Sequence, residues 1–192
     1  MTTNQHSSTA LLVMDIQAGF LDRVLNPDGL KQAIPAAIDA ARKAGIPVFY
    51  VVVGFRKGLP EVNPRNKSFG ALRQNPAYAA GLEEPIQIEP VVKPLPGEVV
   101  ITKRRISAFA GSDLDVVLRA HNIHHLVLTG ISTSGVVLST LREAADKDYS
   151  LTVLSDGCSD GDAEVHNVLV TKVFPRHAAI LTAAEWVESI KG

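Results

Sequence analysis

The chain has 192 residues and a mass of 20.5 kDa, which is the size of one domain with a substantial hydrophobic core. Hydrophobic residues make up 46% of the sequence and charged residues 20%, a composition that excludes an intrinsically disordered chain. The 19 basic side chains nearly balance the 20 acidic ones, and a net charge of -1 provides no overall field to bind nucleic acid or an anionic membrane.

We also expect neither a signal peptide nor a membrane-spanning segment. The polar leader, residues 1–8, lacks the basic and then apolar layout of a signal peptide, and the longest apolar run, residues 48–53, is too short to span a bilayer. The single cysteine, Cys158, cannot form an internal disulfide. We therefore expect one domain over residues 1–192, located in the cytoplasm and not bound to a membrane.

Short apolar runs alternate with helical patterns along the chain, as in βαβ units on a parallel sheet. A helical spacing of apolar residues between Leu30 and Ala41 ends at Gly45, and Pro35 fits it only in the first turn or at a kink. The fold class is therefore predicted to be α/β, a three-layer αβα sandwich with a six-stranded parallel sheet. The predicted strands are 9–14, 47–53, 98–102, 125–129, 151–154 and 178–181, and the later helices are 113–120, 136–146, 163–172 and a closing helix with Trp186.

A proline-rich insert, residues 54–97, interrupts this alternation and contains seven of the 11 prolines. We expect loops and short helical pieces there, lying over the sheet. Long ordered loops on an α/β scaffold commonly determine specificity.

Candidate catalytic residues follow the apolar runs, because ligands of parallel sheets bind outside the carboxyl ends of the strands. Asp15 follows the first strand, Lys103 follows the third, and residues 130–135 follow the fourth. A carboxylate and an ammonium at one rim could exchange a proton, and free N–H groups where the next helix begins could bind developing negative charge. The alternatives are a capping role for Asp15, a solvated basic turn around Lys103 and a plain connection at 130–135.

Motifs for common cofactors are missing. No Gly-Lys-Ser/Thr ending follows residues 130–135, and no G-x-G-x-x-G follows the first strand, so neither a P-loop nor a dinucleotide site is predicted. His121, His124 and His125 straddle a helix end and a strand start, and we expect them at the surface and not on a metal. We predict no cofactor and no metal.

Cys158 lies in the segment Ser155–Asp160, after the fifth predicted strand. Its acidic neighbours would raise the pKa of the thiol, which argues against a reactive thiolate. We interpret Cys158 as a small, partly buried packing residue.

Several motifs in order along residues 9–188 resemble the isochorismatase-like (cysteine hydrolase) superfamily. They are Leu11–Gln17 with Phe20, Lys103–Phe109, Gly111–Leu114, Leu128–Thr133 and Val173–Arg176. The resemblance implies a six-stranded parallel sheet flanked by helices, usually in a homo-oligomer that acts on small molecules. It also implies an Asp-Lys-Cys triad, in which the cysteine opens the helix after the fourth strand.

Asp15 and Lys103 match the first two members of that triad, but the nucleophile position falls on Val136. A valine cannot attack a carbonyl, and Cys158 lies one βα unit downstream. The resemblance further implies a cis peptide between Ile131 and Ser132, with the N–H groups of Ser132 and Val136 forming an oxyanion hole. Phe20 matches an aromatic residue that walls the substrate pocket in relatives.

Two branches of the superfamily remain open. Amidase members form a covalent acyl-cysteine, and nicotinamidases add an Asp-x-His metal motif where this chain has residues 53–56 (Val-Gly-Phe-Arg). Isochorismatase members hydrolyse a vinyl ether with an aspartic acid, and some lack the cysteine. We therefore predict a metal-free small-molecule hydrolase that uses Asp15 and Lys103. The alternatives are a catalytically silent binder or assembly protein and, third, an amidase.

Overall fold

The computed structural model describes residues 8–74 and 87–191. Most of the leader and the middle of the insert, with two of its prolines, therefore lie outside the described residues. The described chain forms one six-stranded sheet in which every pairing is parallel, in the order β3-β2-β1-β4-β5-β6. The strands are β1 (Thr9–Met14), β2 (Val48–Val53), β3 (Val99–Lys103), β4 (His125–Ile131), β5 (Ser150–Ser159) and β6 (Ala179–Leu181). The α/β fold with a six-stranded parallel sheet is thus confirmed.

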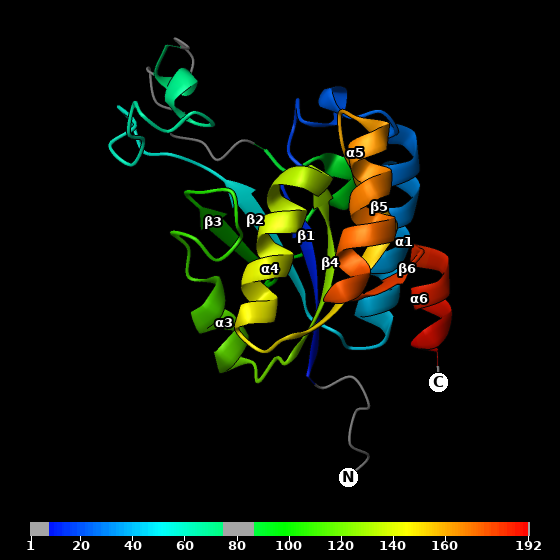
Figure 1. Ribbon diagram of the computed structural model, residues 1–192. Coiled ribbons are helices and arrows are strands. Elements are labelled where there is room, and N and C mark those ends of the chain that lie inside the picture. The colour runs from blue at the N-terminus through cyan, green and yellow to red at the C-terminus, as the bar shows by residue number, and fades with distance from the viewer. Residues whose placement is uncertain (1–7, 75–86, 192) are drawn as a thin grey trace.

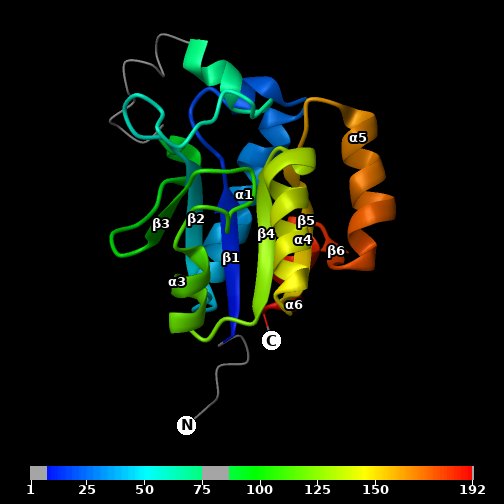
Figure 2. The same cartoon turned by 60° about the vertical axis from the view of Figure 1, so that its left-hand side comes forward.

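Helices cover both faces of the sheet. The helices α1 (Pro27–Lys43) and α6 (Ala183–Ser189) lie together on one face, while α3 (Leu114–Ala120), α4 (Leu138–Asp146) and α5 (Ala163–Val168) lie on the other (Figure 1; Figure 2). Asn26 caps α1 by accepting a hydrogen bond from the Gly29 N–H, and Pro35 lies inside that helix. The arrangement is the predicted three-layer sandwich.

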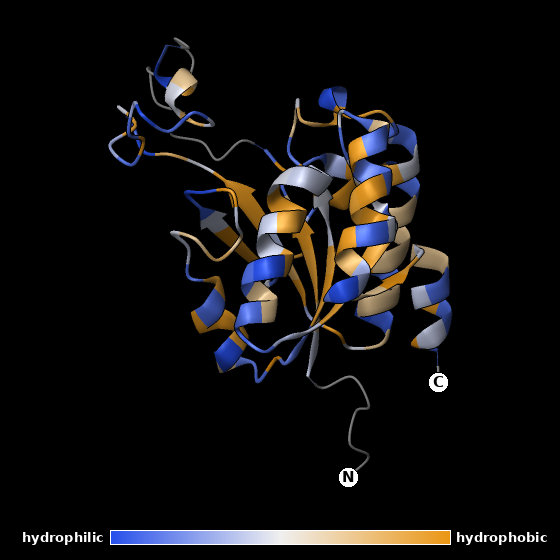
Figure 3. Cartoon of the chain, in the orientation of Figure 1, coloured by the Kyte–Doolittle hydropathy of each residue, from blue (hydrophilic) through white to orange (hydrophobic). Residues whose placement is uncertain are grey.

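The core consists of two layers separated by the sheet. All six residues of β1 are buried; Ala10, Leu12 and Met14 pack with α3 and α4, while Leu11 and Val13 pack with α1 and α6. A strand buried on both faces has to be a continuous apolar run, and helices need only one apolar face. Figure 3 shows this difference as uniformly hydrophobic central strands and two-sided helices.

Several predicted boundaries were wrong, and the largest error concerns β5. The strand continues to Ser159 instead of ending at Leu154, because a register shift lets pairing resume after the polar residues 155–157, with Gly130 opposite Cys158. The helix after β4 begins at Thr133 and not at Val136, as a π-helical turn (η4, Thr133–Val137) that Ser132 caps. The other predicted strand ends agree within about two residues.

The insert was expected to contain short helical pieces, and the 3-10 turns η2 (Gly70–Gln74) and η3 (Pro90–Val92) confirm this for its described part. Residues 54–74 extend from the carboxyl end of β2, beyond the end of the sheet (Figure 1). A single antiparallel bridge, between Gln17 and Ile88, joins the returning part of the insert to the chain after β1. No helix of the described residues is long and apolar enough to cross a membrane.

Candidate active site

The candidate site lies where the order of the strands reverses. β1 lies between β2 and β4 in the sheet, and the connections that follow β1 and β4 lead in opposite directions. Such a switch point leaves a crevice at the carboxyl ends of the strands. Asp15 directly follows β1, Lys103 ends β3, and η4 follows β4, so all three predicted segments meet at this edge.

Asp15 and Lys103 form a buried ion pair. The Nζ atom of Lys103 lies 2.9 Å from Oδ2 of Asp15, and only 3% and 7% of the two side chains are exposed. Lys103 also donates a hydrogen bond of 3.0 Å to the carbonyl oxygen of Arg105. The alternative of a solvated basic turn is therefore wrong for Lys103, which turns away from solvent although two arginines follow it.

The backbone fixes the position of the carboxylate. Asp15 has a φ of 56°, in the left-handed region that few residues other than glycine, asparagine and aspartate adopt. Its N–H donates to the carbonyl oxygen of Val51, which continues the β1–β2 pairing by one residue. The turn thus directs the side chain of Asp15 over the end of β2, toward Lys103 on the next strand.

Burial changes the acidity of this carboxyl group. Desolvation raises the pKa of Asp15 from 3.8 to about 6, while the charge and the hydrogen bond of Lys103 limit the rise. The second oxygen, Oδ1, is buried and has no hydrogen-bond partner among the described residues. Asp15 can therefore hold or release a proton near neutral pH, with one oxygen uncommitted to the protein.

The turn after β4 forms the next wall of the site. The peptide between Ile131 and Ser132 is cis, as the resemblance implied. The Ser132 side chain accepts a hydrogen bond from the Gly135 N–H at 3.1 Å. The carboxylate of Asp160, beyond the end of β5, accepts one from the Ser134 N–H at 2.7 Å. These contacts fix the first turn of η4 beside the ion pair.

A cavity of about 420 Å³ opens over these groups. Asp15, Lys103, Ser132 and Val136 line one side of it. The other side comes from loops: Phe20, Arg23 and Val24 at the 3-10 turn η1 (Leu21–Arg23), residues 68–69 of the insert, Ile106 and residues 160–161. Phe20 is among them, so every predicted site residue lies at one cavity. Whether the N–H groups of Ser132 and Val136 bind an oxyanion stays a prediction.

Comparison with known proteins identifies the family. Residues 9–185 match the model of the isochorismatase domain. The chain belongs to the isochorismatase family. It is 30% identical to the uncharacterized isochorismatase family protein YecD of Escherichia coli O157:H7, over 95% of this chain and 96% of that protein. It is 33% identical to the ureidoacrylate amidohydrolase RutB of Pantoea ananatis, over 95% of this chain and 79% of RutB.

A solved structure agrees with this assignment. An isochorismatase family protein from Burkholderia thailandensis superposes with a TM-score of 0.79 at 27% identity, covering 97% of both chains. Because the family comprises hydrolases, the rim of the sheet is a candidate site of hydrolysis.

Within this isochorismatase-family site, the insert is tied to the strand ends by polar contacts. Glu61 pairs with Arg56 at 2.8 Å and with Arg104 at 3.3 Å, and Arg104 also donates to the carbonyl oxygen of Gly54. The buried side chain of Gln17 both accepts from the Val53 N–H and donates to the Val53 carbonyl oxygen. These contacts therefore fix the start of the insert to the carboxyl ends of the strands.

Cys158 is not one of the residues that line the cavity. It was predicted to lie after the fifth strand and to be partly buried; it lies within β5 and only 4% of it is exposed. Burial raises the pKa of its thiol to about 12, and the Asp156 charge adds less than burial does. The prediction of an unreactive packing residue stands, but burial is the main cause.

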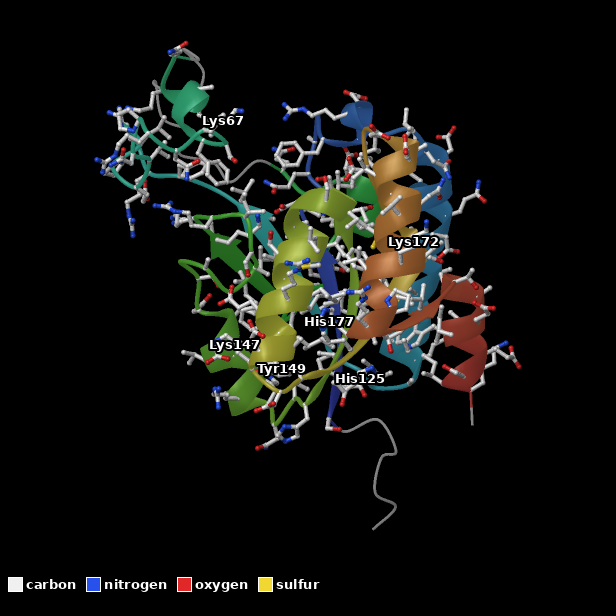
Figure 4. The ribbon with its side chains drawn as sticks, viewed as in Figure 1. Lys67, His125, Lys147, Tyr149, Lys172 and His177 are labelled. Atoms are coloured by element: carbon white, nitrogen blue, oxygen red, sulfur yellow. The ribbon has the colours of Figure 1, made fainter. Side chains whose placement is uncertain are left out.

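The histidine cluster lies away from the candidate site. His125 is at the end of the sheet opposite to Lys67 of the insert (Figure 4), and its ring contacts the hydroxyls of Thr9 and Thr152. His121 and His124 are exposed. No group of three or more metal-ligating side chains occurs in residues 8–74 and 87–191.

Asp160, Arg23 and Phe69 are among the cavity residues that the sequence analysis missed. Asp160 directly follows β5, but the strand-end rule did not find it because the strand was predicted to end at Leu154. Arg23 and Phe69 lie on loops whose sequence carries no periodic signal. Phe69 packs edge-on against Phe55, with ring centroids 5.4 Å apart.

Proposed function

We propose that the protein hydrolyses a small molecule with Asp15 and Lys103, without a covalent cysteine intermediate and without a metal. The observation that carries the proposal is the buried Asp15–Lys103 pair, which opens on a cavity beside Val136 and not beside a nucleophile. We assign Val136 to the position of the family's cysteine. A silent family member would need neither an uncommitted buried carboxylate oxygen nor an open cavity above it.

Hydrolysis of a vinyl ether suits these groups. Protonated Asp15 donates its proton to the terminal carbon of the C=C bond, which leaves an oxygen-stabilised cation. Water then adds to the cationic carbon and returns a proton to the Asp15 carboxylate. The resulting hemiketal breaks into a ketone and an alcohol. Asp15 ends the cycle protonated, as it began, and Lys103 keeps its pKa close enough to neutral for both transfers.

Amide hydrolysis is the second candidate, and the likeness to RutB favours it. Without a nucleophilic side chain, water would have to attack the carbonyl with ionised Asp15 as the general base. The two reactions need opposite protonation states of Asp15. With a pKa of about 6, about one Asp15 side chain in ten is protonated at pH 7.

The test compares isochorismate and ureidoacrylate as substrates of the wild type and Asp15→Asn. We expect turnover of the vinyl ether to fall at least ~1000-fold in Asp15→Asn, because the amide cannot supply the proton. The expected kcat/KM decreases as pH rises through about 6, where the acid form is lost. Asp22→Asn, which changes an acid of η1 outside the cavity lining, is the matched control.

Each result has a distinct meaning. Activity that decreases as pH falls below about 6 assigns Asp15 as a base and favours the amide reaction. A substrate-mass adduct on the intact protein during turnover would contradict the absence of a covalent intermediate. Full turnover by a folded Asp15→Asn variant would make Asp15 structural, and no turnover of either substrate by the wild type favours the silent alternative.

A further inference from the structure

The charges that line the cavity leave one cation unpaired among the described residues. Asp15 and Lys103 neutralise each other at 2.9 Å. Asp160 uses both carboxylate oxygens on backbone N–H groups, with Oδ2 on Ser134 at 2.7 Å and Oδ1 on Gly161 at 2.9 Å. Among the described residues, the side chain of Arg23 has no carboxylate or carbonyl partner. Its guanidinium instead lies near an aromatic ring.

The structure holds this guanidinium in a defined place. The Cζ atom of Arg23 lies 5.0 Å from the centroid of the Phe20 ring, and both residues line the cavity. Arg23 ends η1, whose Leu21 is buried, and the following chain is fixed by the Leu25 N–H on the Asp160 carbonyl oxygen. A guanidinium held near an aromatic ring keeps its N–H groups available to an anionic ligand.

The described part of the insert that reaches the cavity is mainly basic. Five of the six charged side chains in residues 54–74 of the insert are basic, and Ser68 and Phe69 of that segment line the cavity. Positive groups around a cleft raise the local concentration of anionic ligands. Arg23 and the insert thus favour a ligand that carries negative charge, although the net charge of the whole chain is -1.

We propose that Arg23 is a specificity-determining residue that binds a carboxylate of the substrate, so that the cavity takes carboxylate-bearing small molecules in preference to neutral ones. This inference rests on the proposed function for the location of the substrate. The fork of N–H donors on arginine matches the two oxygens of a carboxylate. The carboxylate would lie at the loop side of the cavity, and the bond to be hydrolysed at Asp15 on the strand side.

The test measures binding and not turnover. Calorimetry gives the Kd of isochorismate and of its dimethyl ester, and of ureidoacrylate and its methyl ester, on an Asp15→Asn, Lys103→Met background, in which the strand side stays without net charge as it does in the ion pair. Each ester removes the charge of its acid and adds only one methyl group per carboxylate. We expect the acid to bind about tenfold more tightly than the ester, a modest preference because Arg23 is exposed to water.

Variants then assign this preference. Arg23→Gln should bring the acid and ester affinities to within about twofold of each other, and Arg23→Lys should keep part of the preference. Arg142→Gln removes an exposed arginine of α4 outside the cavity lining and should leave the preference intact. The ester affinity shows whether Arg23→Gln disturbs Phe20, because that damage would weaken both ligands alike.

Two results would overturn the proposal: an acid preference that survives in Arg23→Gln, or equal or undetectable binding of acid and ester in the protein with Arg23. These failures differ from a failure of the proposed function. If Asp15→Asn keeps its activity, the catalytic assignment falls while the Arg23 comparison can still be read. If only Arg23 fails, turnover by wild type persists with its dependence on Asp15.

Discussion

The two sides of the cavity are built in different ways. The strand side consists of Asp15, Lys103, Ser132 and Val136, each at or near the end of a strand in the middle or on one edge of the sheet. The loop side consists of residues 20, 23–24, 68–69, 106 and 160–161. Positions on a hydrogen-bonded sheet are fixed by many neighbours, whereas loop positions depend on a few contacts.

This difference suggests a division of work. The strand side holds groups that must stay within a hydrogen bond of each other, and the 2.9 Å Asp15–Lys103 distance depends on three neighbouring strands. The loop side carries an aromatic pair and an unpaired arginine, which can change without disturbing the sheet. Changes on the strand side should therefore affect the rate or the fold, and changes on the loop side should affect affinity.

The largest effect is expected from Lys103→Met. Methionine fills much of the same buried space but removes the cation that limits the pKa of Asp15, so this pKa should rise above about 6. We expect kcat/KM to fall at least ~100-fold, because Asp15 without its cation is a weaker acid and donates its proton less readily, and the midpoint of the pH profile to move upward. Lys67→Met, on the insert, is the control. A Lys103→Met enzyme within about threefold of wild type would remove Lys103 from the catalytic assignment.

The second test compares two glycines. Gly130 of β4 has a φ of 154°, and a Cβ atom there would lie 2.6 Å from the carbonyl oxygen of Met14. We expect Gly130→Ala to lower the free energy of unfolding by ~2–4 kcal/mol, because the β1–β4 spacing must open. Gly58 of the insert also has a positive φ, of 77°, but has no atom within 4 Å of an added Cβ.

Gly58→Ala should therefore cost only ~1 kcal/mol, for the strained backbone alone. Urea unfolding of both variants measures the difference. Equal losses would contradict the expectation that the sheet tolerates an added side-chain atom less well than the insert does.

The sequence predicted the strand side well, for a physical reason. Buried parallel strands must be continuous apolar runs, and the residue that ends such a run must lie at the rim, so Asp15 and Lys103 could be placed without a structure. The resemblance to a family then gave the cis peptide at Ile131–Ser132. The same rule failed at β5, where residues 155–157 (Ser-Asp-Gly) lie within the strand and hid its continuation to Ser159.

The loop side could not be predicted in this way. Arg23 and Phe69 reach the cavity because η1 and the insert lie beyond the carboxyl ends of the strands, and such paths depend on tertiary contacts such as Glu61 with Arg104. No periodicity records these contacts, which join residues more than forty positions apart. The residues that select the substrate are thus less visible in the sequence than the residues that act on it.

The smallest effect is expected from Phe69→Ala. Phe69 lines the cavity and packs against Phe55, so its loss removes apolar contact with the substrate but leaves the Asp15–Lys103 pair unchanged. We expect KM to rise about five- to tenfold with kcat within about twofold of wild type, as for binding energy that is the same in the ground and transition states. Steady-state kinetics separates the two constants, and Phe69→Leu should recover most of the lost affinity. A parallel fall in kcat would mean that the loop side positions the substrate for reaction, and the division between the two sides would fail.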